Sequence, residues 1–437
     1  MRLLIVSLAA LMAGAPVAAQ ADTLGEAMAS AVDSNPTLAA QRQRLRATRE
    51  QLPQAWSDAL PQVTISGGVS RSSTDNHNPI PDSNNNEDWS AQASASQLLF
   101  GGGRVLASTR AARASIRGAV ADYDQNLQDL LLAVTTAYAD VRQQQAVVSA
   151  RETTVNNLSR LLDYAQAQFD AGVVTRTDVA QAQARLSQAR TQLVQAQGGL
   201  AAAVQAYLRL VGRPPSDLQA PPTATGLPPE LATALDNAGR NSPVLISAVA
   251  NSDLADANVA AAEAQGRPTV SLEASRSTGA DFNDDISRST TDSLGVRFTV
   301  PLFQGGLVQS RTRQQRALRS AADLDLAAAH RSVQESVTNA WTGLASARAA
   351  VDSAQQQVQA AELAYEGVRL EQETGLRSTV EVLNQEQDLL DARLALAQAQ
   401  RDLVVAERQL LASEGALTVE TGSGSSVPQD NDQLRGR

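Results

Sequence analysis

The sequence contains no cysteine and no lysine, and it is poor in aromatic residues. The absence of cysteine excludes disulfide bonds, thiol catalysis, Cys-ligated zinc and iron–sulfur clusters. Aromatic residues make up 3% of the 437 residues. No run of about 20 apolar residues follows the first two dozen positions, which excludes a polytopic helical membrane protein. A β-barrel is not excluded, because barrel strands alternate and contribute little to hydropathy.

The charge and the few histidines exclude further classes of protein. The 46 acidic residues outnumber the 36 basic ones, and the formal net charge of −10 argues against a nucleic-acid partner. Two histidines are too few for a triad or a His-based metal site. No glycine-rich phosphate loop follows a strand. We therefore expect no enzyme activity, no cofactor and no metal.

The N-terminus has the pattern of an export signal. Arg2 precedes the apolar stretch Leu3–Ala13, and small residues follow up to Ala19 and Ala21. This order of a basic residue, an apolar core and an A-x-A site predicts cleavage before Asp22. A membrane anchor is the alternative, but the apolar core is short for a span. Residues 1–21 are thus predicted to be a signal peptide, and the mature protein works beyond the inner membrane.

Most of the remaining chain is two copies of one unit, with punctuating residues that recur in the same order about 200 residues apart. The repeats are predicted at residues 22–211 and 230–412, a Pro- and Thr-rich linker at 212–229 and a disordered polar tail at 413–437. The matching segments of the two copies are Asn35–Leu38 with Ser242–Leu245, Leu60–Ile65 with Arg267–Leu272, Leu98–Gly103 with Pro301–Gly306, and Gly172–Val179 with Gly375–Val382.

In each copy the sequence predicts a helical first segment and then two strands. The helical first segments are about Thr23–Asp58 and Pro229–Gly266. Alternating apolar positions follow, with polar loops predicted at Thr74–Asp88 and Gly279–Asp292. The second strands are predicted at Trp89–Phe100 and Ser293–Phe303. Strands of about ten residues with one apolar face suit a membrane barrel, and a soluble sandwich hairpin equally. Four strands cannot close a barrel, so a membrane barrel requires an oligomer.

Long helices follow each strand pair. Apolar residues recur every seven positions, as in Leu127, Val134 and Val141 of the first copy and Val337, Leu344 and Val351 of the second. A strict period of seven predicts supercoiled helices. A helix from about Arg104 to Asp170 is on the order of 100 Å long, which suits a conduit or a spacer. The predicted fold is mainly α with a small β part, built from a duplicated helix-strand-strand-helix-helix unit.

The turns between the long and the shorter helices carry capping signals. Gly172 and Gly375 are natural ends of the long helices. Thr175 and Ser378 are natural N-caps, and Asp178 and Glu381 stand three residues later, at the capping-box position. Helix capping alone accounts for these two acids. A ring of charge, formed by oligomer symmetry, is the functional alternative.

This order of elements, with the strand exit Pro301–Gly306 and a tip of the form Gly-x-x-Ser/Thr-x-x-Asp/Glu-Val, resembles the outer-membrane efflux protein family, the TolC-like channel-tunnels. The resemblance covers about Asp22 to Ala412. It implies a homotrimer with a 12-stranded outer-membrane barrel continuous with a 12-helix periplasmic tunnel. It also implies contact with outer-membrane lipid, a periplasmic adaptor and an inner-membrane transporter of the RND, ABC or MFS type. The channel would be a passive conduit for efflux or type I secretion in a Gram-negative outer membrane.

The resemblance also assigns roles to single residues. Glu381 and Asn384 match positions that ring the closed periplasmic entrance, and Arg377 and Asp178 match the set that holds neighbouring hairpins shut. Gln372 stands where the family has an aromatic partner, which weakens the expected latch. The adaptor-docking tips would be Gly172, Val173, Gly375 and Leu376. The strand–helix junctions would be Pro61, Gly102, Gly103, Pro268, Pro301, Gly305 and Gly306.

A periplasmic coiled-coil scaffold or adaptor that never enters a membrane is the alternative function. The strand pairs distinguish the two, because an adaptor would lack two duplicated strand pairs with apolar faces. The sequence does not name the cargo, since drug efflux, metal efflux and type I protein secretion share this outer component.

Overall fold

The computed structural model describes residues 22–76, 82–282 and 284–419. The predicted signal peptide and the last 18 residues of the predicted tail lie outside this part.

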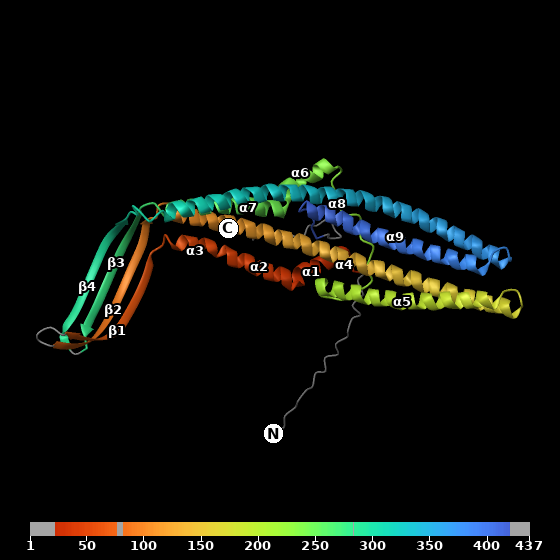
Figure 1. Ribbon diagram of the computed structural model, residues 1–437, viewed down its shortest axis with the longest axis horizontal. Helices are drawn as coiled ribbons and strands as arrows, with labels where there is room; N and C mark the ends of the chain where they lie inside the picture. Colours follow the sequence, from red (N-terminus) through yellow and green to blue (C-terminus); the bar gives the residue numbers. More distant parts are fainter. Residues whose placement is uncertain (1–21, 77–81, 283, 420–437) are drawn as a thin grey trace, which may run out of the picture.

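The chain forms an elongated molecule with a four-stranded sheet at one end and two helical hairpins at the other (Figure 1). The same series of elements occurs twice along the chain. The first is α1 (Leu24–Ser34), α2 (Pro36–Arg49), α3 (Gln51–Ser57), β1 (Gln62–Asn76), β2 (Asp82–Phe100), α4 (Arg104–Asp170) and α5 (Arg176–Val211). The second is α6 (Leu231–Asn241), α7 (Pro243–Ala264), β3 (Thr269–Asp281), β4 (Asp284–Thr299), α8 (Leu307–Glu373) and α9 (Thr379–Ser413).

The opening segments are helical, as predicted, and prolines divide them. Asn35 caps α2 by accepting hydrogen bonds from the N–H groups of Thr37 and Leu38. Pro36 follows at the first helical position, where its missing N–H costs nothing. In the second copy Ser242 and Pro243 take the same places at the start of α7. The long helix predicted from Arg104 to Asp170 is confirmed, and α8 has the same length of 67 residues.

The four strands form one antiparallel sheet in the order β1-β2-β3-β4. One face carries the apolar side chains: Val63, Ile65 and Val69 of β1, and Leu294, Val296 and Phe298 of β4, are all more than 60% exposed in the single chain. Their direct partners across the ladders include Ala93, Ala95 and Leu272. Thr64, Ser66 and Ser275 point to the opposite face, because side chains alternate along a strand. The sheet therefore has one apolar and one polar face.

The strands extend further than the sequence predicted. We expected polar loops at Thr74–Asp88 and Gly279–Asp292, but β2 begins at Asp82 and β4 at Asp284. Backbone pairing continues through the polar residues, for example between Thr74 and Asn84. The prediction was wrong because the alternating pattern marks only the apolar part of a strand, whereas the ladder needs only backbone N–H and C=O groups. β4 also ends at Thr299, so the expected strand residues up to Phe303 lie outside it.

The main apolar core lies midway along the helices. Leu24 and Met28 of α1 pack there with Leu131, Val134 and Tyr138 of α4. The linker and the C-terminal segment complete this core with Leu218, Ala224 and Leu417. The Tyr138 hydroxyl lies 2.7 Å from the carbonyl oxygens of both Asp22 and Gln219, and therefore joins the start of the described chain to the linker. None of the described helices is long and apolar enough to span a bilayer.

The disordered tail was predicted to begin at residue 413, but the residues directly after it are ordered against the helices. Residues 414–419 are packed against the helices: Leu417 is 1% exposed, and its N–H donates to Gln128 Oε1 at 3.0 Å. Gln128 Nε2 in turn donates to the Leu417 carbonyl at 3.0 Å. The mostly polar composition after Ser413 gave no indication in the sequence that Leu417 is buried.

Candidate functional site: the hairpin tips

Both long helices end in the same tight turn at the end of the molecule away from the sheet (Figure 1). Gly172 and Gly375 each have a φ of +78°, the left-handed conformation that glycine adopts without a steric penalty. The N–H of Gly172 donates to Phe169 O and that of Val173 to Gln168 O, at 2.9 and 2.8 Å. Gly375 and Leu376 make the equivalent bonds to Gln372 and Glu371 at 3.0 and 2.9 Å. These bonds satisfy the last carbonyls of each helix, which is the Schellman arrangement.

The apolar residue after each glycine points into solvent. Val173 is 70% and Leu376 77% exposed. In a Schellman turn the residue at this position often packs back against its own helix. Here both tips instead present an apolar side chain outward.

The predicted capping boxes are confirmed at both tips. Asp178 Oδ2 accepts from the Thr175 N–H at 2.9 Å, and the Asp178 N–H donates to Thr175 Oγ1 at 3.3 Å. Glu381 Oε2 accepts from the Ser378 N–H and from Ser378 Oγ, both at 2.9 Å. Hydrogen bonds to Thr175 hold the pKa of Asp178 below its usual value.

Arg377 joins the two helices of its own hairpin. Its Nε donates to Glu371 Oε2 in the last turn of α8, and its Nη1 to Glu381 Oε1 in the first turn of α9, both at 2.8 Å. Within the protomer Arg377 therefore binds Glu371 and Glu381 rather than Asp178. The Ser378 backbone N–H and Arg377 together lower the pKa of Glu381 to about 2. The Glu381 carboxylate thus stays ionised across the physiological range.

The other residues expected at the gate lie nearby on α9 and α8. Asn384 is exposed and lines a groove with Gln181 and Arg185 of α5. Gln372, in the place of the expected aromatic residue, is buried, and its Nε2 lies 3.4 Å from Thr379 Oγ1. It therefore binds within its own hairpin.

The expected strand–helix junctions lie where the sheet meets the helices. Pro61 and Pro268 immediately precede β1 and β3, and Pro301 follows β4. The pairs Gly102 with Gly103 and Gly305 with Gly306 all have positive φ and immediately precede α4 and α8. A Cβ at Gly102 would lie 2.6 Å from Arg267 Cβ, so the backbone can pass there only as glycine.

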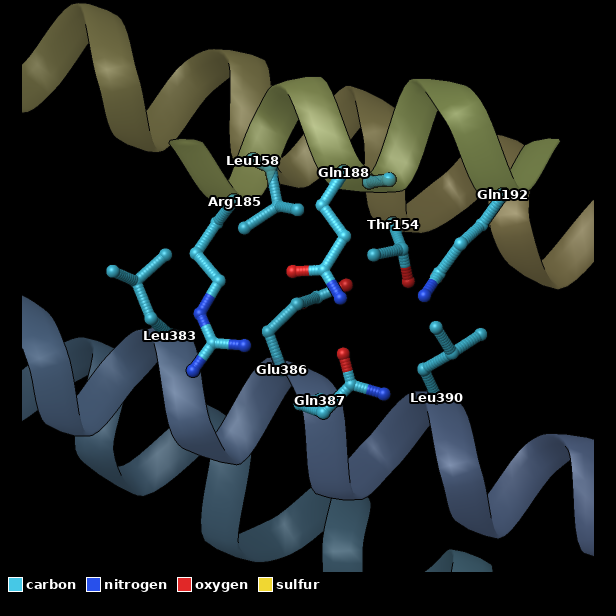
Figure 2. Close-up of a pocket in the computed structure, with 10 residues that line it drawn as sticks. Thr154, Leu158, Arg185, Gln188, Gln192, Leu383, Glu386, Gln387 and Leu390 are labelled. Atoms are coloured by element: carbon cyan, nitrogen blue, oxygen red, sulfur yellow. The ribbon is translucent and has the colours of Figure 1, made fainter. Parts of the chain in front are cut away.

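A buried polar cluster above the tips was not predicted. Glu386 of α9 is 3% exposed, and Asn157 Nδ2 of α4 donates to its Oε2 at 3.1 Å and its Oε1 at 3.3 Å. Figure 2 shows Glu386 extending from α9 toward Thr154 of α4 and Gln188 of α5. A sequence signal existed, because Glu386 interrupts the apolar seam that Val382, Leu383, Leu389 and Leu390 form on α9.

The described residues contain no group of three or more His, Cys, Asp or Glu side chains arranged to hold a metal ion. The chemistry of the tips is therefore that of helix caps, ion pairs and exposed apolar side chains.

Comparison with known proteins identifies the family. A model described as "Outer membrane efflux protein" matches the chain twice, over residues 27–213 and 234–416. The chain belongs to the outer membrane efflux protein family. It is 30% identical over 398 residues to the outer membrane efflux protein BepC of Brucella suis biovar 1, covering 89% of this chain and 85% of BepC. It is 26% identical over 401 residues to the outer membrane protein TolC of Escherichia coli K12, covering 86% of this chain and 80% of TolC. The fold matches the Campylobacter jejuni outer membrane channel CmeC with a TM-score of 0.81 at 17% identity, covering 94% of this chain and 88% of CmeC.

This outer membrane efflux protein is accordingly a channel component of the class that serves efflux and type I secretion. It belongs in the outer membrane of a Gram-negative bacterium and has a large periplasmic part. The family is one of transport channels. The scaffold alternative finds no support, because the structure contains both strand pairs that an adaptor would lack.

Proposed function

We propose that three copies of the chain assemble into a 12-stranded outer-membrane barrel continuous with a 12-helix periplasmic tunnel. One observation carries this proposal: in the described sheet β1 pairs only with β2, and β4 only with β3. The outer edges of β1 and β4 therefore carry unpaired backbone groups, which cannot be left unpaired inside a bilayer. Joining β4 of one copy to β1 of the next closes the sheet and removes every edge.

The two faces of the sheet fit this assembly. The apolar face of β1 and β4 would contact lipid, and the polar face would line a water-filled lumen. Four long helices per chain, α4, α5, α8 and α9, would supply the tunnel wall. Their heptad residues Val337 and Leu344 are already buried within one copy, whereas Leu363 and Leu370 of α8 remain more than 50% exposed and available to a neighbour.

We infer that the tunnel is gated at the hairpin tips by Asp178, Arg377, Glu381 and Asn384. Arg377 already fixes the turn between α8 and α9, and an ion pair or hydrogen bond with Asp178 of a neighbouring copy would tie the tips together.

The exposed apolar residues Val173 and Leu376, each beside its glycine, suit docking of a periplasmic adaptor. The channel is a passive conduit, without enzyme activity or cofactor, and an inner-membrane transporter of the RND, ABC or MFS type would supply the energy. Drugs, metal ions and secreted proteins are all compatible cargoes, and the pump decides among them.

Assembly is tested by electrophoresis of outer-membrane fractions. We expect trimers that resist detergent and dissociate on heating. A protein recovered only from the soluble periplasm would contradict the proposal.

Gating is tested by removing the Arg377 guanidinium. Arg377→Ser removes the cation that Glu371 and Glu381 share and the partner proposed for Asp178 of a neighbouring copy. The tips should therefore separate, and conductance in planar bilayers should rise several-fold. Asp178→Ala is expected to act in the same direction. Arg369→Ser is the matched control, because among the described residues Arg369 bonds Glu366 and Glu373 of its own helix. Equal conductance of Arg377→Ser and wild type would show that Arg377 does not hold the gate.

A further inference from the structure

The carboxyl group of Glu386 lies where the four long helices of one chain meet. It belongs to α9, about two turns beyond the tip, and accepts both hydrogen bonds from Asn157 of α4. The hydroxyl groups of Thr154 on α4 and Tyr365 on α8 lie close enough to lower the pKa of this carboxyl group. Gln188 and Gln192 of α5 line the same cleft (Figure 2). One side chain thus joins the hairpin α4–α5 to the hairpin α8–α9.

The charged groups that face Glu386 do not neutralise it by a direct ion pair. Arg393, two turns further along α9, acts at a distance and bonds Glu362 of α8 at 2.9 Å. Arg185 of α5 lines the cleft but is itself exposed. On α4 the partners Thr154 and Asn157 are uncharged, and the cation Arg151 donates to Gln192 Oε1 of the cleft at 2.7 Å. The remaining titratable groups on the α8 side are Tyr365, whose pKa is raised to about 12 by burial and by Glu386, and its neighbours Glu366 and Arg369.

We propose that Glu386 is a positioning residue of the gate, a proton-sensitive clasp between the two hairpins of one protomer. When Glu386 is protonated the seam between α4 and α9 is tight and the channel is held closed. When it is ionised the seam is loosened and opening is favoured. This inference rests on the proposed gating at the tips, because it assigns the seam above them to the same movement.

The direction follows from the cost of burying a charge. Burial raises the pKa of Glu386 above its ordinary value, and the hydrogen bonds from Asn157 and the nearby hydroxyl groups of Thr154 and Tyr365 offset this only in part. Separation of the hairpins would hydrate the carboxyl group and return its pKa toward about 4.3. The closed state therefore binds the proton more tightly. It is fully stabilised below the ordinary carboxyl pKa, and this stabilisation is lost as the pH rises through the raised value.

Two acids of the tips, Glu381 and Asp178, do not titrate in the same window. Glu381 has a pKa of about 2, and that of Asp178 is also lowered, so both stay ionised while Glu386 changes state. Their pairs would weaken only in stronger acid and would act in the opposite direction. Acid-induced closing would therefore report on Glu386.

The test is the pH dependence of conductance of full-length trimers in planar bilayers, using Glu386→Gln. We expect wild-type conductance to fall several-fold between about pH 7 and about pH 4.5, since each unit of pKa difference shifts the equilibrium about tenfold. Glu386→Gln has the shape and neutrality of the protonated acid, so its conductance should be low and independent of pH. Asp388→Asn is the matched control: it removes an exposed acid two residues away on α9 and should behave as wild type.

Wild-type trimers that conduct without any pH dependence, or a Glu386→Gln variant that keeps the wild-type profile, would overturn this inference alone. Wild-type protein that forms neither trimers nor pores would overturn the proposed function as well. Hydrogen exchange on wild-type trimers tests the seam without a mutation. After correction for the intrinsic pH effect, amides around 154–158 and 382–390 should exchange more slowly at the acidic end of the range. Unchanged or faster exchange there would contradict the clasp.

Discussion

Two acids five residues apart on α9 have opposite environments. The Glu381 side chain is 42% exposed and receives hydrogen bonds from Ser378 and Arg377, which stabilise its charged form. Glu386 is enclosed by helices, and burial favours its neutral form. The capping role of Glu381 could be predicted from the sequence, because a capping box is local and depends only on spacing. The environment of Glu386 could not, because it depends on how residues 154 and 157 of another hairpin are placed.

The conformation of glycine at the helix ends gives a prediction at this scale. Gly375 and Gly415 have similar φ values of +78° and +73°, but nothing lies within 4 Å of a Cβ added at Gly375. A Cβ at Gly415 would lie 2.6 Å from the Asn241 carbonyl oxygen. Gly375→Ala should therefore cost only the left-handed conformation, roughly 1–2 kcal/mol, and Gly415→Ala distinctly more. Urea unfolding of purified protein measures both, and equal costs would show that the close contact at Gly415 relaxes freely.

At the scale of whole elements, the sequence predicted most of the helices because period, caps and prolines agree along each of them. The predicted ends of α4, about Arg104 and Asp170, agree with the structure, since a glycine pair precedes Arg104 and Gly172 follows Asp170 closely. The strands were predicted too short, because their polar ends have no alternating pattern to detect. The segment after Ser413 was missed for a related reason: so short a stretch gives no periodic signal. Its packing depends on Gln128 and on the core that Leu417 and Val419 contact.

Two truncations test the role of that segment. Removal of residues 414–437 exposes the site of Leu417, whose burial contributes about 2–3 kcal/mol, and leaves the buried Gln128 without either of its bonds to Leu417. Removal of residues 420–437 alone leaves these contacts intact. We expect the first truncation to lower the melting temperature and the second to leave it near that of the full chain. Equal melting temperatures for the two would show that the segment adds no stability.

At the scale of the whole molecule, one chain is incomplete by its own geometry. The described sheet leaves β1 and β4 at open edges and leaves an apolar face uncovered. From strand number alone, the sequence predicted that a membrane barrel would require an oligomer. The sequence could not show which strands lie at the edges. Strand order depends on the pairing of β2 of the first repeat with β3 of the second repeat within one chain.

Adjacent residues of β1 test which face contacts lipid. Ile65 lies on the apolar face and is 80% exposed in the single chain, whereas Ser66 points to the opposite face. Ile65→Arg places a cation in the hydrocarbon layer, at a cost of roughly 2–4 kcal/mol near its centre, and should reduce the amount of trimer in outer-membrane fractions. Ser66→Arg adds the same charge on the polar face and should be tolerated. The reverse order of effects would exchange the assignment of the two faces.

The equal length of α4 and α8, 67 residues each, has a consequence for how such a protein can change over time. Both helices start at the sheet and end at a tip, so they set the distance between the sheet and the tips. An insertion of seven residues in only one copy would move one tip by about 10 Å relative to the other. The two tips therefore stay level only when a gain or loss of residues in one repeat is matched by the same change in the other.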